Sequence, residues 1–301
     1  MAVRVEIPSS FLQQPRWWTE GQDWLASLPG LITEQCRRWK LIIDGTPMHG
    51  SNALVLPVRR SGAETSGERL MLRMSPPDER TASEIAALDF WAGRGTVLQL
   101  AADPATGAGL LERLDPDRSL TTVGLTEAAE VLGALMRRLA VPVSADVVAP
   151  RTSELIGRRV AELEADWSAL GRPMDQSLMT AAVAAGEQLT KITDDVAANG
   201  DLHHDQVLAG TREPWLVVDP ALLVGDIGYD LARCLWWRLD EMADDRVIND
   251  QLARIAGAAG LDLDHARTAA LYRTVDYWLW GLKHGLTEDP VRCARLCAAI
   301  G

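Results

Sequence analysis

Three side chains that carry oxygen atoms stand at spacings suited to holding a metal ion beside a phosphate. Gln206 follows Asp201 by five residues in the stretch Asn-Gly-Asp-Leu-His-His-Asp-Gln. Asp219 comes after two short apolar runs joined by Thr-Arg-Glu-Pro, a pattern that predicts a β-hairpin returning Asp219 to the other two. Carboxylate and amide oxygens, completed by phosphate oxygens, are ligands that suit Mg²⁺. The spacing therefore predicts phosphoryl transfer, with Asp201 as the base and Gln206 and Asp219 as metal ligands.

The bulk composition limits the classes of protein to which this chain can belong. Its 301 residues, 47% of them hydrophobic, are enough for a core divided between two lobes. A formal net charge of −12 argues against nucleic-acid binding through bulk charge and favours a cationic small substrate, although solubility alone would also explain it. The four cysteines form no metal or disulfide pattern, and the sequence contains no signal peptide or membrane-spanning run. We expect a cytoplasmic protein without membrane contacts.

The order of predicted elements indicates an α+β architecture. Residues 1–40 read as a helical extension, with short helices at 22–28 and 31–39 separated by a Pro-Gly pair. Residues 41–114 are rich in strand patterns and residues 115–301 in helical ones. We therefore expect the extension to pack on a small antiparallel β lobe, followed by a large, mainly helical lobe that carries the catalytic loop.

The residues around Asp201 resemble the H-G-D-L-H-x-x-N signature of aminoglycoside phosphotransferases, and the Val-Asp-Pro at 218–220 resembles their I-D-P. Residues 215–231 are similar to the streptomycin 6-kinase and hydroxyurea phosphotransferase branch, as are 24–29 and 110–114. The resemblance covers most of the chain. It implies a protein-kinase-like bilobal fold and a monomeric enzyme that uses ATP (or GTP) and Mg²⁺.

The resemblance also implies where the nucleotide binds. Ser51 lies in the loop at 45–52, which would cover the phosphates, although spacing alone fits an ordinary hairpin loop equally well. Arg73 ends the third strand, where kinases carry a Lys, and Glu84 on the next helix would be its ion-pair partner. The alternative for Arg73 is an exposed arginine on a strand edge. Glu112 and Leu114 would belong to the hinge, whose backbone groups bind adenine.

The acceptor implied by the resemblance is a cationic antibiotic, either an aminoglycoside such as streptomycin or a tuberactinomycin such as capreomycin or viomycin. Its phosphorylation would confer antibiotic resistance. The expected contacts lie around the catalytic loop and in an acidic segment that could equally be a solvated helix end: His203, Asp205, Trp237, Asp240 and Glu241. Zinc binding by the two adjacent histidines is not expected, because no partner stands at ligand spacing. Asp226 and Asp230 are expected to be structural acids that brace the catalytic loop or cap the following helix.

Three positions depart from the family pattern. Arg73, Asn199 and Gln206 stand where the family usually has Lys, His and Asn. Gln206 can still offer an amide oxygen, but through one extra methylene. These departures keep two alternatives open: a metabolic small-molecule kinase on the same scaffold, and a homologue that binds nucleotide or ligand without turnover.

Overall fold

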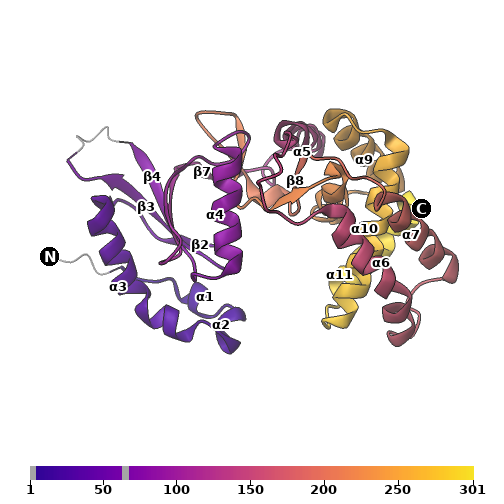
Figure 1. Cartoon of the computed structure of the whole chain (residues 1–301), viewed down its shortest axis with the longest axis horizontal. Coiled ribbons are helices and arrows are strands. Elements are labelled where there is room, and N and C mark those ends of the chain that lie inside the picture. The colour runs from indigo at the N-terminus through magenta and orange to yellow at the C-terminus, as the bar shows by residue number, and fades with distance from the viewer. Residues whose placement is uncertain (1–4, 63–67) are drawn as a thin grey trace. The chain divides into compact units, whose positions relative to one another are not determined.

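The computed structural model describes residues 5–62 and 68–301, and the chain folds as two compact units, Met1–Asp115 and Pro116–Gly301. The first four residues of the expected N-terminal extension lie outside the described residues. The first unit is built on an antiparallel sheet and the second mainly on helices, which confirms the predicted α+β class (Figure 1). None of the described helices is long and apolar enough to cross a membrane.

The described part of the first unit places a six-stranded sheet between helices. Its strands run in the order β1-β3-β4-β6-β5, with β2 paired to β3, and the sheet lies between α3 and α4 (Figure 1). The elements are α1 (Ser9–Leu12), α2 (Arg16–Thr19), α3 (Gln22–Trp39), β1 (Leu41–Ile43), β2 (Met48–His49), β3 (Leu54–Arg60), β4 (Arg69–Met74), α4 (Glu79–Trp91), β5 (Gln99–Asp103) and β6 (Ala108–Glu112). The predicted third strand is confirmed residue for residue by β4.

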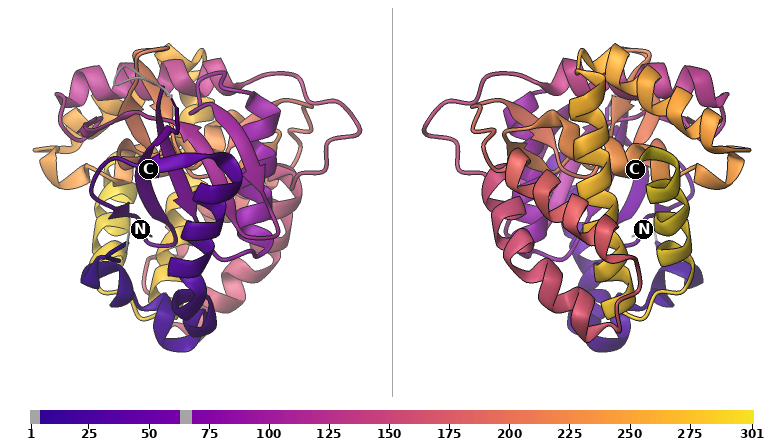
Figure 2. Two further views of the ribbon diagram at one scale, coloured as in Figure 1. Left: turned by 90° about the vertical axis from the view of Figure 1, so that its left-hand side faces the viewer. Right: turned by 90° about the vertical axis from the view of Figure 1, so that its right-hand side faces the viewer.

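Side chains alternate along β4 and so divide the sheet into two faces. Leu70, Leu72 and Met74 are fully buried and belong to a hydrophobic core that they share with side chains of α3, the helix that lies across the sheet in the left view of Figure 2. Arg73 lies between them in sequence and therefore points to the opposite face, the one covered by α4. The alternation of side chains along β4 therefore directs Arg73 toward α4, the helix that carries Glu84.

The prediction of two short helices near the N-terminus was wrong. A single helix, α3, runs through Pro29 from Gln22 to Trp39. Trp24, Leu28 and Ile32 recur every four residues on its buried face. Burying each of them stabilises the helix by about 1.5–3 kcal/mol, which together exceeds the roughly 3 kcal/mol that an interior proline costs. Packing against the sheet therefore overrides the local break.

The second unit is a helical bundle with two small sheets. Helix α10 lies among the other helices and contacts α6, α7, α8, α9 and α11 (Figure 2, right). The described elements are β7 (Asp115–Ser119), α5 (Leu125–Leu139), α6 (Thr152–Ala169), α7 (Gln176–Leu189), β8 (Ala197–Asn199), η1 (His204–Gln206), β9 (Val207–Ala209), β10 (Trp215–Val217), β11 (Leu222–Val224), η2 (Ile227–Asp230), α8 (Leu231–Trp236), η3 (Leu239–Glu241), α9 (Asp245–Ala259), α10 (Leu263–Lys283) and α11 (Glu288–Ile300).

The small sheets frame the loop that contains Asp201. Strands β9 and β10 pair antiparallel, which confirms the predicted hairpin, and β7 joins them next to β9. Strand β8 pairs with β11 and ends at Asn199, two residues before Asp201. Strands β7, β8 and β11 were not predicted, because each is short and lies beside turn residues.

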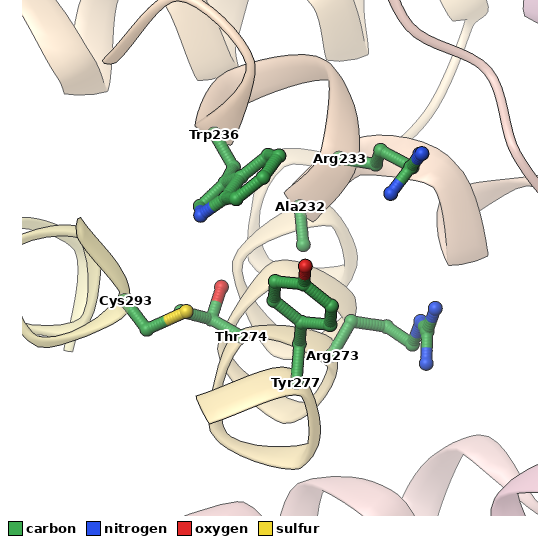
Figure 3. A pocket seen from close by; sticks show the side chains of 7 residues that line it. All are labelled: Ala232, Arg233, Trp236, Arg273, Thr274, Tyr277 and Cys293. Atoms are coloured by element: carbon green, nitrogen blue, oxygen red, sulfur yellow. The ribbon is translucent and has the colours of Figure 1, made fainter. Parts of the chain in front are cut away.

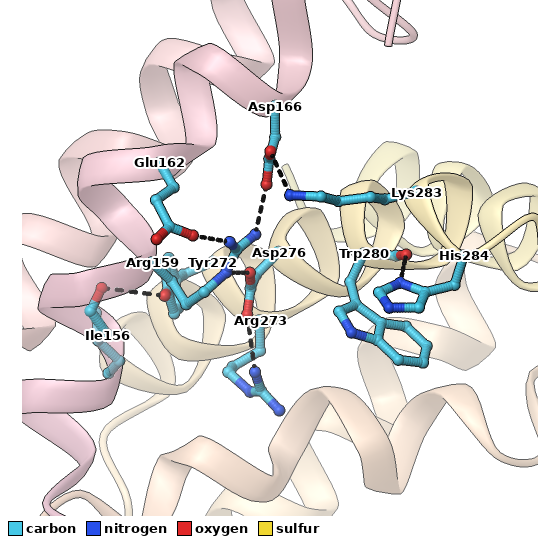
Figure 4. A network of polar contacts seen from close by, with 10 residues as sticks. All are labelled: Ile156, Arg159, Glu162, Asp166, Tyr272, Arg273, Asp276, Trp280, Lys283 and His284. Atoms are coloured by element: carbon cyan, nitrogen blue, oxygen red, sulfur yellow. Dashed lines mark hydrogen bonds and ion pairs between the residues drawn. The ribbon is translucent and has the colours of Figure 1, made fainter. Parts of the chain in front are cut away.

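The helices are fixed to one another partly by buried charge. Arg159 of α6 contacts Asp276 of α10 at 2.9 Å and Asp166 at 3.1 Å, and Arg273 contacts Asp276 at 3.0 Å (Figure 4). Asp276 therefore braces the junction of α6 and α10. Among its neighbours on α10, Trp280 is partly exposed and stacks on His284.

Candidate functional site

The backbone around Asp201 is held by contacts from three directions. The Asp201 N–H donates to the Asn199 carbonyl at 2.6 Å, and the Asn199 side chain accepts a hydrogen bond from the Ala221 N–H at 2.9 Å. The Leu202 N–H donates to the carboxylate of buried Asp230 at 3.2 Å. The loop thus has a fixed course from the end of β8 into η1. Asp230 therefore binds the loop backbone, as expected.

Each carboxylate oxygen of Asp201 contacts a nitrogen atom of another side chain. The Gln206 Nε2 amide donates to Asp201 Oδ2 at 3.1 Å. The Arg233 Nε atom lies 2.5 Å from Asp201 Oδ1 in an ion pair. The Asp201 side chain remains 34% exposed, so solvent or an acceptor can still reach it.

Gln206 and Asp219 are brought together by the hairpin. Val207 pairs with Val217, and the Val218 N–H donates to the Gln206 carbonyl at 2.8 Å, one residue before exposed Asp219. The Gln206 side chain is buried, and within the described residues its Oε1 atom has no hydrogen-bond partner. The amide nitrogen of Gln206 therefore contacts Asp201, while its amide oxygen makes no hydrogen bond within the described residues. The hairpin returns the chain at Val218 to Gln206, and the Gln206 side chain contacts Asp201, so the joint role of Asp201, Gln206 and Asp219 stays a prediction.

The available oxygens fit Mg²⁺. The described residues contain no cluster of three or more His, Cys, Asp and Glu side chains that could hold a metal. An amide oxygen and one or two carboxylates form an incomplete set, which phosphate oxygens and water would complete for Mg²⁺. An unpartnered buried amide oxygen is costly on its own, and a cation would satisfy it. The side chains present therefore fit a nucleotide-bound Mg²⁺.

The two histidines of the loop are buried and neutral. His203 stacks on Trp237 with ring centroids 3.8 Å apart and an interplanar angle of 15°. Burial, followed by the nearby Arg233 charge, lowers the pKa of His203 to about 3. Burial also lowers the pKa of His204 to about 4, with Arg238 as the next cause. Neither histidine can serve as a cation near neutral pH. His203 is only 6% exposed, and the Trp237 ring covers one face of its imidazole.

The acidic residues expected to attract a cation are partly neutralised by arginines. Asp240 pairs with Arg292, and Glu241 pairs with Arg238 through both of its oxygens, the shorter contact at 2.5 Å. Asp205 is exposed beside the loop. Their role toward an acceptor stays a prediction.

A small cavity in the second unit is lined in part by Arg233, the ion-pair partner of Asp201. It has a volume of about 30 Å³, and Arg233 lies on its wall with Trp236, Arg273 and Tyr277 (Figure 3). The Tyr277 hydroxyl donates to Asp289 at 2.9 Å. Space of this size holds about one or two water molecules, not an antibiotic.

In the first unit, Arg73 and Glu84 form the predicted ion pair. Arg73 also donates to Ser75 Oγ at 2.7 Å. Strand β4 is flanked by β3 and β6, and each side chain of the pair is only 11% exposed. The alternative of an exposed arginine on a strand edge is therefore wrong.

The other residues that were expected to bind the nucleotide lie in loops and at the end of a strand. Ser51 is exposed, and its hydroxyl accepts a hydrogen bond from Asn52 at 3.0 Å. The Glu112 carboxylate accepts from the Leu98 N–H at 2.8 Å, which ties it to its own sheet. Leu114 is 8% exposed and follows β6. The side chain of Glu112 is therefore structural, which agrees with a hinge that acts through its backbone.

Sequence reasoning missed two arginines at these sites. Arg233 was not singled out, although it stands on α8 three residues after Asp230, the N-cap of that helix. Arg16 was also missed. It donates to Asn52 at 3.0 Å and to Asp78 at 2.6 Å, and so joins the expected phosphate loop to the N-cap of α4.

Comparison with known proteins gives consistent matches. Residues 38–285 match the family described as aminoglycoside/hydroxyurea antibiotic resistance kinase. The chain is 37% identical over 285 residues to a streptomycin 6-kinase of Streptomyces glaucescens, covering 90% of this chain and 89% of that one. It is 36% identical over 308 residues to a hydroxyurea phosphotransferase of Kitasatospora aureofaciens, covering 96% and 84%.

The fold has solved relatives of low sequence identity. The structure of a macrolide 2'-phosphotransferase from Brachybacterium faecium superposes with a TM-score of 0.57 at 19% identity, over 92% of this chain and 98% of that one. Solved structures of choline kinases and aminoglycoside phosphotransferases are similar too. The predicted kinase-like fold is confirmed.

Proposed function

Since this chain belongs to the aminoglycoside/hydroxyurea antibiotic resistance kinases and is a phosphotransferase that acts on hydroxyl groups, we propose that it transfers the terminal phosphoryl group of ATP or GTP to a hydroxyl of a cationic antibiotic. The relatives named for streptomycin favour an aminoglycoside of that kind. Capreomycin and viomycin are the second candidates. Modification of a hydroxyl that the antibiotic needs for target binding would give resistance.

One observation carries the proposal: the Gln206 side chain is divided between two tasks. Its nitrogen lies on the carboxylate of Asp201, and its buried oxygen has no partner within the described residues. A Gln that replaces the usual Asn therefore keeps both contacts that the reaction needs. This geometry argues against a homologue that has lost turnover.

The chain's own residues have separate roles in the proposed reaction. Asp201 accepts the hydrogen bond of the acceptor hydroxyl and receives its proton as the hydroxyl oxygen bonds to the terminal phosphorus. The bond from that phosphorus to the bridging oxygen breaks, and the nucleoside diphosphate leaves. Gln206 Oε1 and Asp219 would hold Mg²⁺, which neutralises phosphate charge when bound. Arg73, braced by Glu84, is assigned to the nucleotide phosphates.

The test is a panel of acceptors with the Asp201→Ala variant. Streptomycin, hydroxyurea, capreomycin and viomycin are each incubated with the protein, ATP and Mg²⁺, and products are read by the mass gain of one phosphate. We expect turnover of a cationic antibiotic, its loss in Asp201→Ala, and retained nucleotide binding in that variant. Asp194→Ala, which removes an exposed acid shortly before β8, is the matched control. Near wild-type turnover by Asp201→Ala would refute the assignment.

A further inference from the structure

Arg233 contacts the proposed base from a different element than the catalytic loop. It lies on α8, and its Nε atom is 2.5 Å from Asp201 Oδ1. Its guanidinium carbon stands 5.4 Å from the centre of the Trp237 ring. A planar guanidinium over an indole face is held by cation–π attraction and loses little further freedom when it pairs with a carboxylate.

Trp237, over whose ring Arg233 lies, also contacts the catalytic loop. Trp237 stacks on His203, two residues after Asp201, at a centroid distance of 3.8 Å. Asp230, at the start of the same helical segment, accepts the Leu202 N–H. Helix α8 and its flanks therefore hold the loop at consecutive residues: Asp201 through a side chain, Leu202 through its backbone and His203 through its ring.

The two partners of Asp201 approach different oxygens. Gln206 donates to Oδ2, and Arg233 pairs with Oδ1. The terminal torsion of an Asp side chain is broad and weakly staggered, so the carboxylate plane is set by its contacts. Each carboxylate oxygen has two acceptor sites, so Oδ1 can keep Arg233 and still accept an acceptor hydroxyl. Losing Arg233 would remove one of the contacts that set this plane.

We propose that Arg233 is a positioning residue of the phosphoryl transfer, which fixes the Asp201 carboxylate so that Oδ1 meets the acceptor hydroxyl. This inference rests on the proposed function, because it acts through Asp201 as the base. In this proposal Arg233 acts through Asp201 and has no assigned contact with the nucleotide. Its loss should therefore lower kcat and leave the KM for nucleotide unchanged.

The cavity beside Arg233 permits a sharp test by chemical rescue. Truncation in Arg233→Ala would enlarge a space of about 30 Å³ that this side chain already lines (Figure 3). We expect kcat to fall roughly 10- to 100-fold, the effect of a misplaced catalytic group. Guanidinium chloride at millimolar concentration, far below the molar range that unfolds proteins, should restore much of the loss with saturation. Urea at the same concentration should not.

A neighbouring arginine supplies the matched control. Arg273 lines the same cavity, but it pairs with Asp276 at 3.0 Å and lies over the Tyr229 ring at 3.9 Å. Arg273→Ala should lower the Tm, and guanidinium should give no rescue of kcat. Arg233→Met, which keeps the apolar stem on Trp237, is the second variant should Arg233→Ala fold poorly.

The outcomes separate this inference from the proposed function. A low kcat in Arg233→Ala or Arg233→Met, rescued by guanidinium with an unchanged KM for nucleotide, supports it. A full kcat in either folded variant overturns it, as does a loss of kcat in Arg233→Ala that guanidinium leaves unchanged. An active Asp201→Ala would remove the proposed function itself, whereas an inactive Asp201→Ala beside a fully active Arg233→Ala removes only the role of Arg233.

Discussion

Removing the Glu84 carboxylate should perturb the proposed nucleotide site without removing any group that we assign to the phosphates. Glu84 pairs with Arg73, which also donates to Ser75 Oγ at 2.7 Å. Both side chains of the pair are 11% exposed, so salt in solution screens the pair only weakly. In Glu84→Ala the guanidinium keeps its charge but loses the carboxylate that sets its direction.

The size of the effect follows from the contacts. A hydrogen bond to a charged group contributes roughly 1.5–3 kcal/mol, and Arg73→Ala should lose a contact of this kind with phosphate. A loss of about 1–3 kcal/mol corresponds to about 5- to 150-fold in nucleotide affinity. Glu84→Ala should give a part of that loss. Because both side chains act through one ion pair, the double variant should lose much less than the sum.

The assay is a double-mutant cycle on the dissociation constant of ATP·Mg²⁺ measured by calorimetry, with kcat/KM followed in parallel. Glu84→Gln keeps the shape and hydrogen-bonding capacity of the side chain without its charge, so it separates the electrostatic part from the steric part. Arg73→Lys restores the residue that the family usually has, and it should retain binding only if Glu84 reaches the shorter side chain. Strictly additive losses, or unchanged affinity in Arg73→Ala, would refute the phosphate role.

Three further changes test other parts of the chain. Asp219→Asn should weaken Mg²⁺-dependent nucleotide binding by about 10- to 100-fold. An affinity for ATP·Mg²⁺ equal to that of the wild type, measured by calorimetry, would contradict a metal role. Arg16→Ala frees the loop at Asn52 and should raise the KM for nucleotide about twofold to fivefold at constant kcat, whereas a pure loss of Tm would indicate packing alone. The hydrogen bond to Asp226 raises the pKa of His265, so this pair stabilises the fold fully below about pH 6.5 and less as the pH rises through the raised pKa. The Tm deficit of His265→Gln should therefore be larger near about pH 6 than near about pH 9, and a deficit independent of pH would exclude the charge.

The parts of the site that the sequence predicted depend on short-range geometry. The return of Asp219 to Gln206 needed only two apolar runs and a turn, and the paired strands have that register. The ion pair of Arg73 and Glu84 was expected from the family resemblance, and the alternation along β4 and the position of the next helix explain why it forms. In both cases the separation along the chain is short, and local rules of secondary structure fix the direction of the side chains.

The parts that were missed depend on packing between distant segments. Arg233 reaches Asp201 because Asp230 fixes the start of a helix against the loop, a contact that spans 28 residues. The continuity of α3 through Pro29 depends on a sheet formed by later residues. A periodic pattern in one segment cannot indicate which surface will cover it, so neither feature follows from local rules.

The arrangement around Asp201 also bears on why Gln206 is compatible with turnover. A Gln side chain has one more rotatable bond than Asn, and holding it in place costs additional conformational freedom. Its nitrogen is anchored on Asp201, which is itself anchored by Arg233 from α8. The oxygen of Gln206 is thereby fixed through the base and not through its own backbone alone. A substitution at Arg233 should then let Gln206 shift together with the base during the transfer, which lowers kcat, and Asn at position 206 should make kcat less dependent on Arg233. The double variant Arg233→Ala with Gln206→Asn separates these effects: a kcat above that of Arg233→Ala alone supports this coupling, and a lower one contradicts it.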